Sequence, residues 1–158
     1  MEEVGQERHP LRLSEQEFLE TFKKVPRLAI NLLIIDDQGK VLLTKRNIPP
    51  QKGYWHYPGG FLLRDESIVE CQRRIAEKEF GLRLDDNNSL KLLGAFEDLD
   101  KDPRGHVVDL MYGLQLNDVS VVNTTDETSE FRFFEKLPRE MGFDHQDTLI
   151  KLGYQVEE

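Results

Sequence analysis

The sequence predicts a single α/β domain in which helices pack against a β-sheet, and three observations lead to this prediction. At 158 residues, with 38% hydrophobic residues, the chain matches one domain of ordinary size and can bury a core. Several β-rich runs are accompanied by helical segments at both ends and in the middle of the chain. No internal repeat or low-complexity tract interrupts this order. We therefore expect an α/β sandwich rather than an all-β barrel, with no linker inside it.

The elements follow from hydrophobic periodicity and from turn and capping signals. In chain order they are a loosely held segment over 1–12, a helix over 14–24, strands at 27–36, 40–46 and around 54–58, a helix over 67–80, strands at 89–99, 106–116 and 130–135, and a helix near 144–154. The first two helices begin with capping boxes, Ser14 with Glu17 and Ser67 with Glu70. Gly81 stands where a left-handed C-terminal cap belongs.

Turns and helix ends carry further local signals. Asp37-Gln38-Gly39 separates the first two strands and predicts a hairpin in which the glycine supplies a positive φ angle. Gly59 and Gly60 precede the middle helix, and we expect them to let the backbone bend tightly there. Asp144 and His145 are expected to form a packing or capping pair at the start of the last helix.

Charge and cysteine content restrict the partners and the compartment. The chain has 30 acidic and 21 basic residues and a net charge of -9, so nucleic-acid polymers and anionic membrane surfaces are unfavourable partners. A small phosphate-bearing ligand stays open, because one metal ion and a few basic side chains can reverse the local field. No apolar run approaches the roughly 20 residues that span a bilayer. The single cysteine, Cys71, and an N-terminus without signal-peptide features predict a cytoplasmic protein.

The middle helix brings together the residues with the strongest chemical signal. Because helical residues advance by about 100° each, Ile75, Lys78 and Glu79 share one neighbourhood. Glu70 and Arg74 are four residues apart, which predicts an ion pair on the adjacent face. An ordinary amphipathic surface helix explains the same segment. Its inward side would consist of Ile68, Cys71 and Ile75.

The spacing of this segment resembles the Nudix box, in which glycine, glutamate and arginine recur at fixed offsets. The matching positions are Gly60, Glu66, Arg74, Ala76, Glu79, Gly81 and Leu82. Ile75 and Lys78 stand where the box has two further glutamates. The resemblance covers most of residues 27–152, and the segments beside the box look like the ADP-ribose pyrophosphatase branch. GDP-mannose mannosyl hydrolases, a Nudix branch that also lacks both glutamates and is active, are similar around the box. They usually have an arginine where this chain has Phe61, and a C-terminal histidine base that the corresponding region here lacks.

This resemblance implies a Nudix fold over residues 1–158, an α/β/α sandwich with a mixed β-sheet. It further implies a Mg²⁺-dependent hydrolase, with Mn²⁺ as the alternative cation, that cleaves the diphosphate linkage of ADP-ribose or a nucleotide sugar by water attack. The alternative is a catalytically impaired module that binds ADP-ribose or another nucleotide without hydrolysis. Homodimers are common in the resembled branch.

The resemblance also implies a reduced metal site. Glu79 is the expected principal ligand and catalytic residue, assisted by the Gly60 carbonyl and by Glu127 or Glu130. One or two carboxylates suffice for Mg²⁺ when waters and substrate phosphates complete its shell. The box residues Glu66, Arg74 and Gly81 are expected to build the structure around this site.

Five residues are candidates for substrate binding: Arg46, Phe61, Lys78, Arg104 and His106. Arg46 and Arg104 can bind phosphate oxygens through their guanidinium forks, and Arg104 lies in a Gly- and Pro-defined loop of the kind that carries function. Arg46 could equally be an exposed strand end. Lys78 either contacts the diphosphate as a point charge or is a solvated helix lysine. His106 could bind ligand, act as a base or be structural, and Phe61 is expected to touch the ligand.

Overall fold

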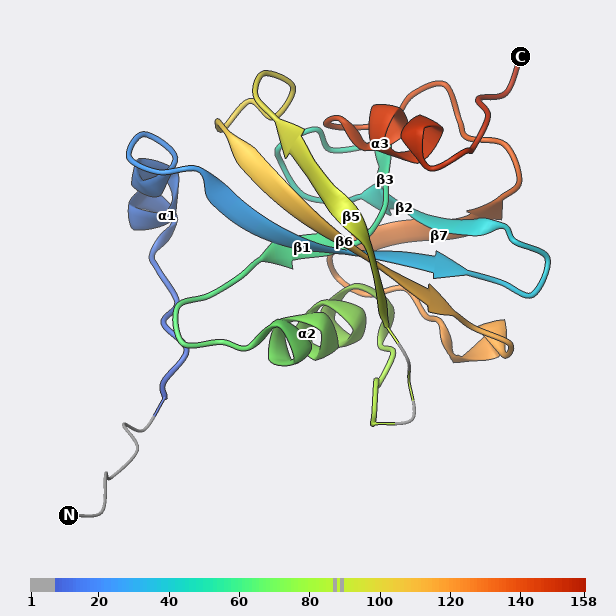
Figure 1. Ribbon diagram of the computed structural model, residues 1–158, viewed down its shortest axis with the longest axis horizontal. Helices are drawn as coiled ribbons and strands as arrows, with labels where there is room; N and C mark the ends of the chain where they lie inside the picture. Colours follow the sequence, from blue (N-terminus) through green and yellow to red (C-terminus); the bar gives the residue numbers. More distant parts are fainter. Residues whose placement is uncertain (1–7, 87, 89) are drawn as a thin grey trace.

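The computed structural model describes residues 8–86, 88 and 90–158 and contains one seven-stranded mixed sheet with helices on both faces (Figure 1). The elements are α1 Glu15–Thr21, β1 Arg27–Ile35, β2 Val41–Arg46, β3 Trp55–His56, β4 Gly59–Phe61, α2 Ile68–Phe80, β5 Lys91–Asp98, β6 Val107–Gln115, a 3₁₀ turn Val119–Val121, β7 Thr128–Phe134 and α3 His145–Lys151. The predicted α/β sandwich is thereby confirmed. Residues 1–7 of the segment predicted to be loosely held, and the predicted strand start at 89, lie outside the described residues.

The sheet is mixed because its two central strands run parallel. β1 pairs with β6 in parallel over its whole length, from Arg27 opposite Val107 to Ile35 opposite Gln115. β5 pairs with β6 and β2 pairs with β1 in the antiparallel sense, which gives the order β3-β2-β1-β6-β5. β4 adds to β1, and β7 adds to β2. A strand such as β1, covered on both faces, needs a nearly continuous apolar run, and its sequence RLAINLLII supplies one.

Two hydrophobic cores fill the space between the sheet and the helices. On the α2 side, Ile30, Leu32 and Ile34 of β1 pack against Cys71 and other apolar residues of α2. On the opposite side, the second core includes Leu33 of β1 and Leu149 of α3. Alternate side chains of one strand thus serve both cores, so the layers are helix, sheet and helix.

The predicted helix caps are present. Ser14 and Ser67 each accept a hydrogen bond from the backbone N–H three residues later, and the glutamate there closes a capping box. Gly81 ends α2 in the left-handed region with φ of 62°. The first helix is shorter than predicted, since α1 ends at Thr21 and the next residues continue as a turn with i→i+3 hydrogen bonds.

The expectation for Gly59 and Gly60 was wrong. Both lie in β4, paired with β1, and neither has a positive φ angle. They are required by close approach instead, because a Cβ at Gly59 would lie 1.9 Å from Oδ1 of Asn31 and a Cβ at Gly60 would lie 3.2 Å from Cγ1 of Ile75. The glycine pair therefore allows β1 and α2 to pack tightly on β4.

The longest helix of the described residues is α2, with 13 residues. None of their helices has the length and apolarity needed to cross a bilayer.

Candidate functional site

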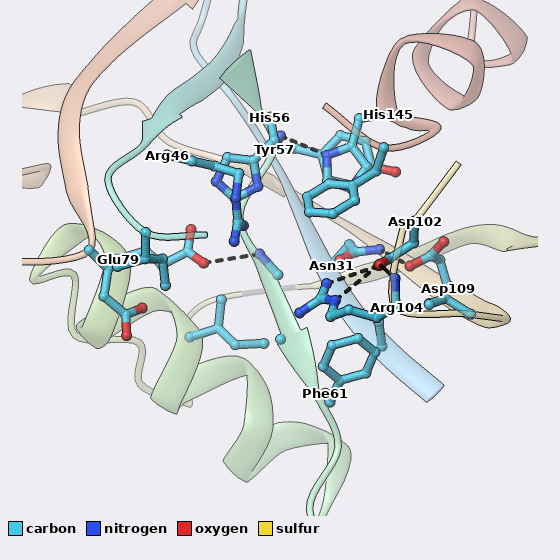
Figure 2. Close-up of a pocket in the computed structure, with 18 of the residues that line it drawn as sticks. Asn31, Arg46, His56, Tyr57, Phe61, Glu79, Asp102, Arg104, Asp109 and His145 are labelled. Atoms are coloured by element: carbon cyan, nitrogen blue, oxygen red, sulfur yellow. Dashed lines mark hydrogen bonds and ion pairs between the residues drawn. The ribbon is translucent and has the colours of Figure 1, made fainter. Parts of the chain in front are cut away.

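A cavity of about 400 Å³ lies beside β4, where segments far apart in the sequence meet (Figure 2). Phe18 of α1 lines one part of it, and α2 lines another through residues of the box helix. The loop after β5, the end of β2 and the start of α3 complete the wall. The cavity thus collects polar side chains from both halves of the chain.

The structure brings most of the predicted site residues to this cavity. The catalytic, substrate-binding and metal candidates that line it are Arg46, Gly60, Phe61, Lys78, Glu79, Arg104 and Glu127, and the box residue Arg74 lines it too. Two of these candidates do not line it. Glu130 lies in β7 with an exposed carboxylate 3.5 Å from Arg132, and His106 lies 3.3 Å from Glu97 just before β6.

Glu79 is the buried acid of the box helix. Its side chain points from α2 toward β4, where Oε1 accepts a weak hydrogen bond from the Gly59 N–H at 3.4 Å (Figure 2). The other oxygen, Oε2, is buried and has no hydrogen-bond partner among the residues that the structure describes. Burial raises the pKa of Glu79 to about 8; the Gly59 hydrogen bond opposes this shift, and the charge of Glu127 adds to it. The site therefore contains a carboxyl oxygen that can accept a further partner.

Lys78 forms an ion pair beside the cavity, and both of its predicted roles stay predictions. Its ammonium lies 2.9 Å from Oε1 of Glu127, in an ion pair at the cavity wall. The lysine side chain is half exposed, and Glu127 is the more buried partner. The ammonium of Lys78 thus contacts Glu127, the second carboxylate that was predicted to bind the metal.

The remaining box residues hold the helix against the preceding loop. Glu66 and Arg74 form a two-pronged ion pair with distances of 2.7 and 2.9 Å, and Arg74 also donates to the carbonyl of Phe61. The predicted Glu70–Arg74 pair was wrong, because Glu70 is used in the capping box of Ser67. Arg74 has five N–H donors on a long side chain, so it reaches acceptors on the preceding loop. A prediction based only on the i,i+4 spacing within the helix does not consider these acceptors.

Arg46 and Arg104 approach the cavity from different loops. Arg46 donates from Nε to the Pro50 carbonyl at 2.6 Å, so it is held in place rather than being a free strand end. Arg104 forms a fork with Asp102, with distances of 3.0 and 2.9 Å. Both guanidinium groups lie close to the ring of Phe143, at 5.0 and 5.5 Å from its centroid. Each retains N–H donors beyond these contacts, because an arginine has five.

Several cavity residues were not predicted from the sequence as functional. They are Asn31, His56, Asp98, Asp102, Asp109, Phe143, Asp144 and His145. The one available signal was a polar residue inside an apolar strand, as for Asp109 in HVVDLMY. Asp109 accepts a hydrogen bond from Asn31 at 2.7 Å, and burial raises its pKa to about 6. The other residues are distant in sequence and meet only in the folded chain.

The two buried histidines of the cavity are poor bases. Burial and the nearby Arg46 lower the pKa of His56 to about 3. Burial also lowers the pKa of His145 well below its ordinary value, and the charge of His56 lowers it further. The ring of His145 stacks on Tyr57 at 3.6 Å, and its Nδ1 accepts from the Tyr57 N–H. The packing part of the Asp144–His145 prediction is therefore right, while the capping part is wrong, since Asp144 makes no side-chain cap hydrogen bond.

The helix–sheet–helix layers and the mixed sheet are those of a Nudix-type domain. So is the segment with Gly60, Glu66, Arg74 and Glu79, which lies beside a cavity lined by arginines. The comparison with known sequences agrees, because the NUDIX domain family matches residues 25–148. The chain belongs to the Nudix family.

Relatives of known description include an enzyme and a regulator. An ADP-ribose pyrophosphatase of Methanocaldococcus jannaschii is 35% identical over 115 residues, which cover 72% of this chain and 65% of the relative. The ADPR responsive transcriptional repressor NtrR of Acinetobacter baylyi is 32% identical over 148 residues, which cover 86% of this chain and 58% of the relative. The chain thus spans less than two thirds of the length of either relative.

Solved structures show the same fold. A MutT/nudix family protein from Enterococcus faecalis superposes with a TM-score of 0.69 at 25% identity, covering 88% of this chain and 68% of that one. The NUDIX domain of Shewanella oneidensis NrtR, complexed with ADP ribose, superposes with a TM-score of 0.66 at 22% identity, covering 89% and 97%.

Proposed function

We propose that this chain hydrolyses the diphosphate linkage of a nucleoside diphosphate derivative, ADP-ribose or a nucleotide sugar. The observation that carries the proposal is the buried Glu79, whose unpartnered carboxyl oxygen lines the same cavity as Arg46 and Arg104. The ADP-ribose pyrophosphatase among the relatives supports the substrate class. We also propose that residues 1–158 form one domain, that the protein is cytoplasmic and that it forms a homodimer.

The donor set is suited to one divalent cation. Nudix hydrolases generally use divalent metals, and Glu79 offers an open buried oxygen here. Glu127 is close enough to raise the pKa of Glu79 by its charge. Among the described residues, no group of three or more His, Cys, Asp or Glu side chains could hold a metal ion. A site with two carboxylates and the Gly60 carbonyl would therefore rely on substrate phosphates and water to complete the shell of Mg²⁺ or Mn²⁺. Such an ion would supply neutralisation of phosphate oxygens.

The chain's own side chains then perform the remaining tasks. Arg46 and Arg104 donate hydrogen bonds to the diphosphate from the N–H groups that they retain. Phe61 and Phe143 cover the arginines and exclude water from them. Since His56 and His145 are weak bases, a carboxylate must accept the proton of the attacking water. We assign this role to the oxygen of Glu127 that does not hold the cation, while Glu79 serves as the principal ligand.

Phosphorus NMR tests this function directly. ADP-ribose is followed with excess protein before and after addition of Mg²⁺, and AMP with ribose 5-phosphate is the expected product pair. Glu79→Gln should reduce the rate at least about 100-fold, because it removes the proposed ligand and its charge. Turnover that is independent of Mg²⁺ and unchanged by Glu79→Gln would contradict the proposal.

A second function, binding without cleavage, is favoured by the ion pair of Lys78. The ammonium engages the Glu127 carboxylate at 2.9 Å, and Ile75 adds no ligand. A pocket of this kind can hold ADP-ribose without hydrolysing it, as a sensor would. The same NMR experiment separates the two, since a binder shifts or broadens the diphosphate signals without forming products.

A further inference from the structure

The guanidinium groups of Arg46 and Arg104 share one aromatic ring. Both side chains point into the cavity (Figure 2), and the centroid of the Phe143 ring lies 5.0 Å from Cζ of Arg46 and 5.5 Å from Cζ of Arg104. Both distances are in the range of a cation–π contact. The two like charges also act on each other, since the charge of Arg104 adds to burial in lowering the pKa of Arg46. Phe143 thus attracts two cations that repel each other.

The backbone holds Phe143 at this place in an unusual conformation. Its φ angle is 55°, in the left-handed region that bulky residues rarely adopt. The residue before it is Gly142, where a Cβ would lie 2.7 Å from Oε1 of Gln51. A bulky residue in this region costs free energy, so surrounding contacts must hold it, and such residues cluster at functional sites. The contact that holds Phe143 therefore belongs to the functional site.

Gln51 supplies that contact from outside the cavity. Its Oε1 accepts a hydrogen bond from the Phe143 N–H at 2.6 Å, although the two residues are 92 positions apart. Gln51 is itself left-handed, with φ of 57°, and it does not line the cavity. The carbonyl of the adjacent Pro50 accepts a hydrogen bond from Nε of Arg46 at 2.6 Å. One short loop thus holds Arg46 through its backbone and Phe143 through a side chain.

We propose that Gln51 is a positioning residue, which sets the relative placement of Arg46 and Arg104 through the ring of Phe143. A diphosphate has charge on two linked phosphate groups, so its affinity depends on where both guanidinium groups lie. A single phosphate can be bound by one of them. Removing the Gln51 oxygen leaves the Phe143 N–H without its acceptor and lets the left-handed backbone relax, which moves the ring away from the arginines. The inference rests on the proposed function only in taking the ligand to be a diphosphate that contacts both arginines.

Calorimetric titration in EDTA, where metal-dependent turnover is not supported, compares two ligands. ADP-ribose has two linked phosphates, whereas AMP has one phosphate and a similar total charge at neutral pH. Gln51→Met keeps the length of the side chain and removes the oxygen acceptor. We expect this variant to bind ADP-ribose about tenfold more weakly than the wild type, and AMP within about twofold. In the Phe143→Ala background, Gln51→Met should change ADP-ribose affinity by less than about twofold, because the residue through which Gln51 acts is gone.

Two further variants separate positioning from stability. Gln51→Gly also lacks the acceptor, but glycine suits the positive φ angle. It should therefore keep a thermal unfolding midpoint close to that of the wild type and still bind ADP-ribose more weakly, and it replaces Gln51→Met in both comparisons if the latter does not fold. Gln146→Met is the matched control, because the Gln146 amide donates to the carbonyls of Pro138 and Arg139. It should bind both ligands as the wild type does.

Three results would overturn the inference: equal losses for ADP-ribose and AMP in Gln51→Met, the same loss for ADP-ribose in the Phe143→Ala background, or no binding of ADP-ribose by the wild type. The background comparison decides alone if AMP binds too weakly to be measured. The expected losses without turnover in Mg²⁺ would support the inference and refute hydrolysis alone. Turnover of ADP-ribose with the same kcat/KM in Gln51→Met as in the wild type would refute only the role of Gln51.

Discussion

The ammonium of Lys78 lies 2.9 Å from a carboxyl oxygen of Glu127, in the wall of the cavity that Glu79 also lines. A cation bound between the two glutamates would have to compete with this internal positive charge. The ion pair is half exposed on the lysine side, so its own contribution to stability is modest. The effect of Lys78 on the binding of a divalent ion is therefore more informative than its effect on stability.

Replacing Lys78 should strengthen metal binding. Lys78→Met removes the competing ammonium and releases Glu127, so we expect Mn²⁺ to bind about threefold to tenfold more tightly, as measured by the electron paramagnetic resonance signal of free Mn²⁺. Lys23→Met is the matched control, because Lys23 pairs with Glu20 on α1 and does not line the cavity. Equal or weaker Mn²⁺ binding in Lys78→Met would show that the lysine does not compete for this site.

The buried Glu79 should make folding stability depend on pH in metal-free buffer. Its pKa in the folded protein is about 8, against an ordinary value of 4.5. Between these values the folded state holds a proton that the unfolded state has lost, so the free energy of unfolding falls as pH rises from about 5 to 8. Glu79→Gln should remove this part of the slope, a difference on the order of a few kcal/mol in chemical denaturation across that range.

Other raised acids do not obscure this comparison. Asp109 and Asp144 have pKa values of about 6 and about 7, and they contribute slopes of the same sign in both proteins. The difference between the two denaturation series isolates Glu79. Parallel pH profiles would mean that Glu79 is ionised in the folded protein without a cation.

The fold was predictable where the signals are local. Ser67 with Glu70, and Gly81, determine the two ends of α2 through contacts within a few residues, and all three were recognised in the sequence. The role of Gly59 was not, because it depends on Asn31, which approaches from a strand 28 positions earlier. The requirement for a small residue is visible only when the strands are paired.

The site divides in the same way. Glu79 could be predicted from the spacing of the box, whereas Asp144 gave no signal beyond a helix start. Asp98, Asp109 and Asp144 come from two strands and a helix terminus, and their proximity results from the antiparallel pairing of β5 with β6 and from the packing of α3. Burial then changes their chemistry, since the same residue type on the surface would have an ordinary pKa.

The Glu66–Arg74 pair should be a principal stabiliser of the box. The side chains are 4% and 21% exposed, so Arg74→Ala leaves a buried carboxylate without its partner. We expect a loss on the order of 3 kcal/mol in the free energy of unfolding. Arg73→Ala removes a neighbouring ion pair with Asp86 whose side chains are 46% and 98% exposed, and it should cost less than about 1 kcal/mol. Similar losses in the two variants, measured by urea denaturation, would exclude a special role for Arg74.

Restoring a carboxylate at position 75 should convert a hydrophobic contact into a metal-dependent one. Ile75 is 2% exposed and packs beside Gly60, one helical turn before Glu79. In EDTA, Ile75→Glu places a second buried acid beside Glu79 and removes apolar packing, so we expect a loss of about 3 kcal/mol or more. Mn²⁺ should recover part of this loss, because a bound cation neutralises both carboxylates and stabilises only the folded state.

Ile75→Gln provides the control for the lost packing. Glutamine has nearly the same shape as glutamate but no charge, so its thermal unfolding midpoint should fall in EDTA and respond to Mn²⁺ no more than that of the wild type. If the two variants respond alike to Mn²⁺, the cation does not bind between positions 75 and 79, and the proposed metal site at this helix is wrong. If only Ile75→Glu recovers, the cavity has the geometry of a carboxylate metal site although Ile75 stands where the box has a glutamate.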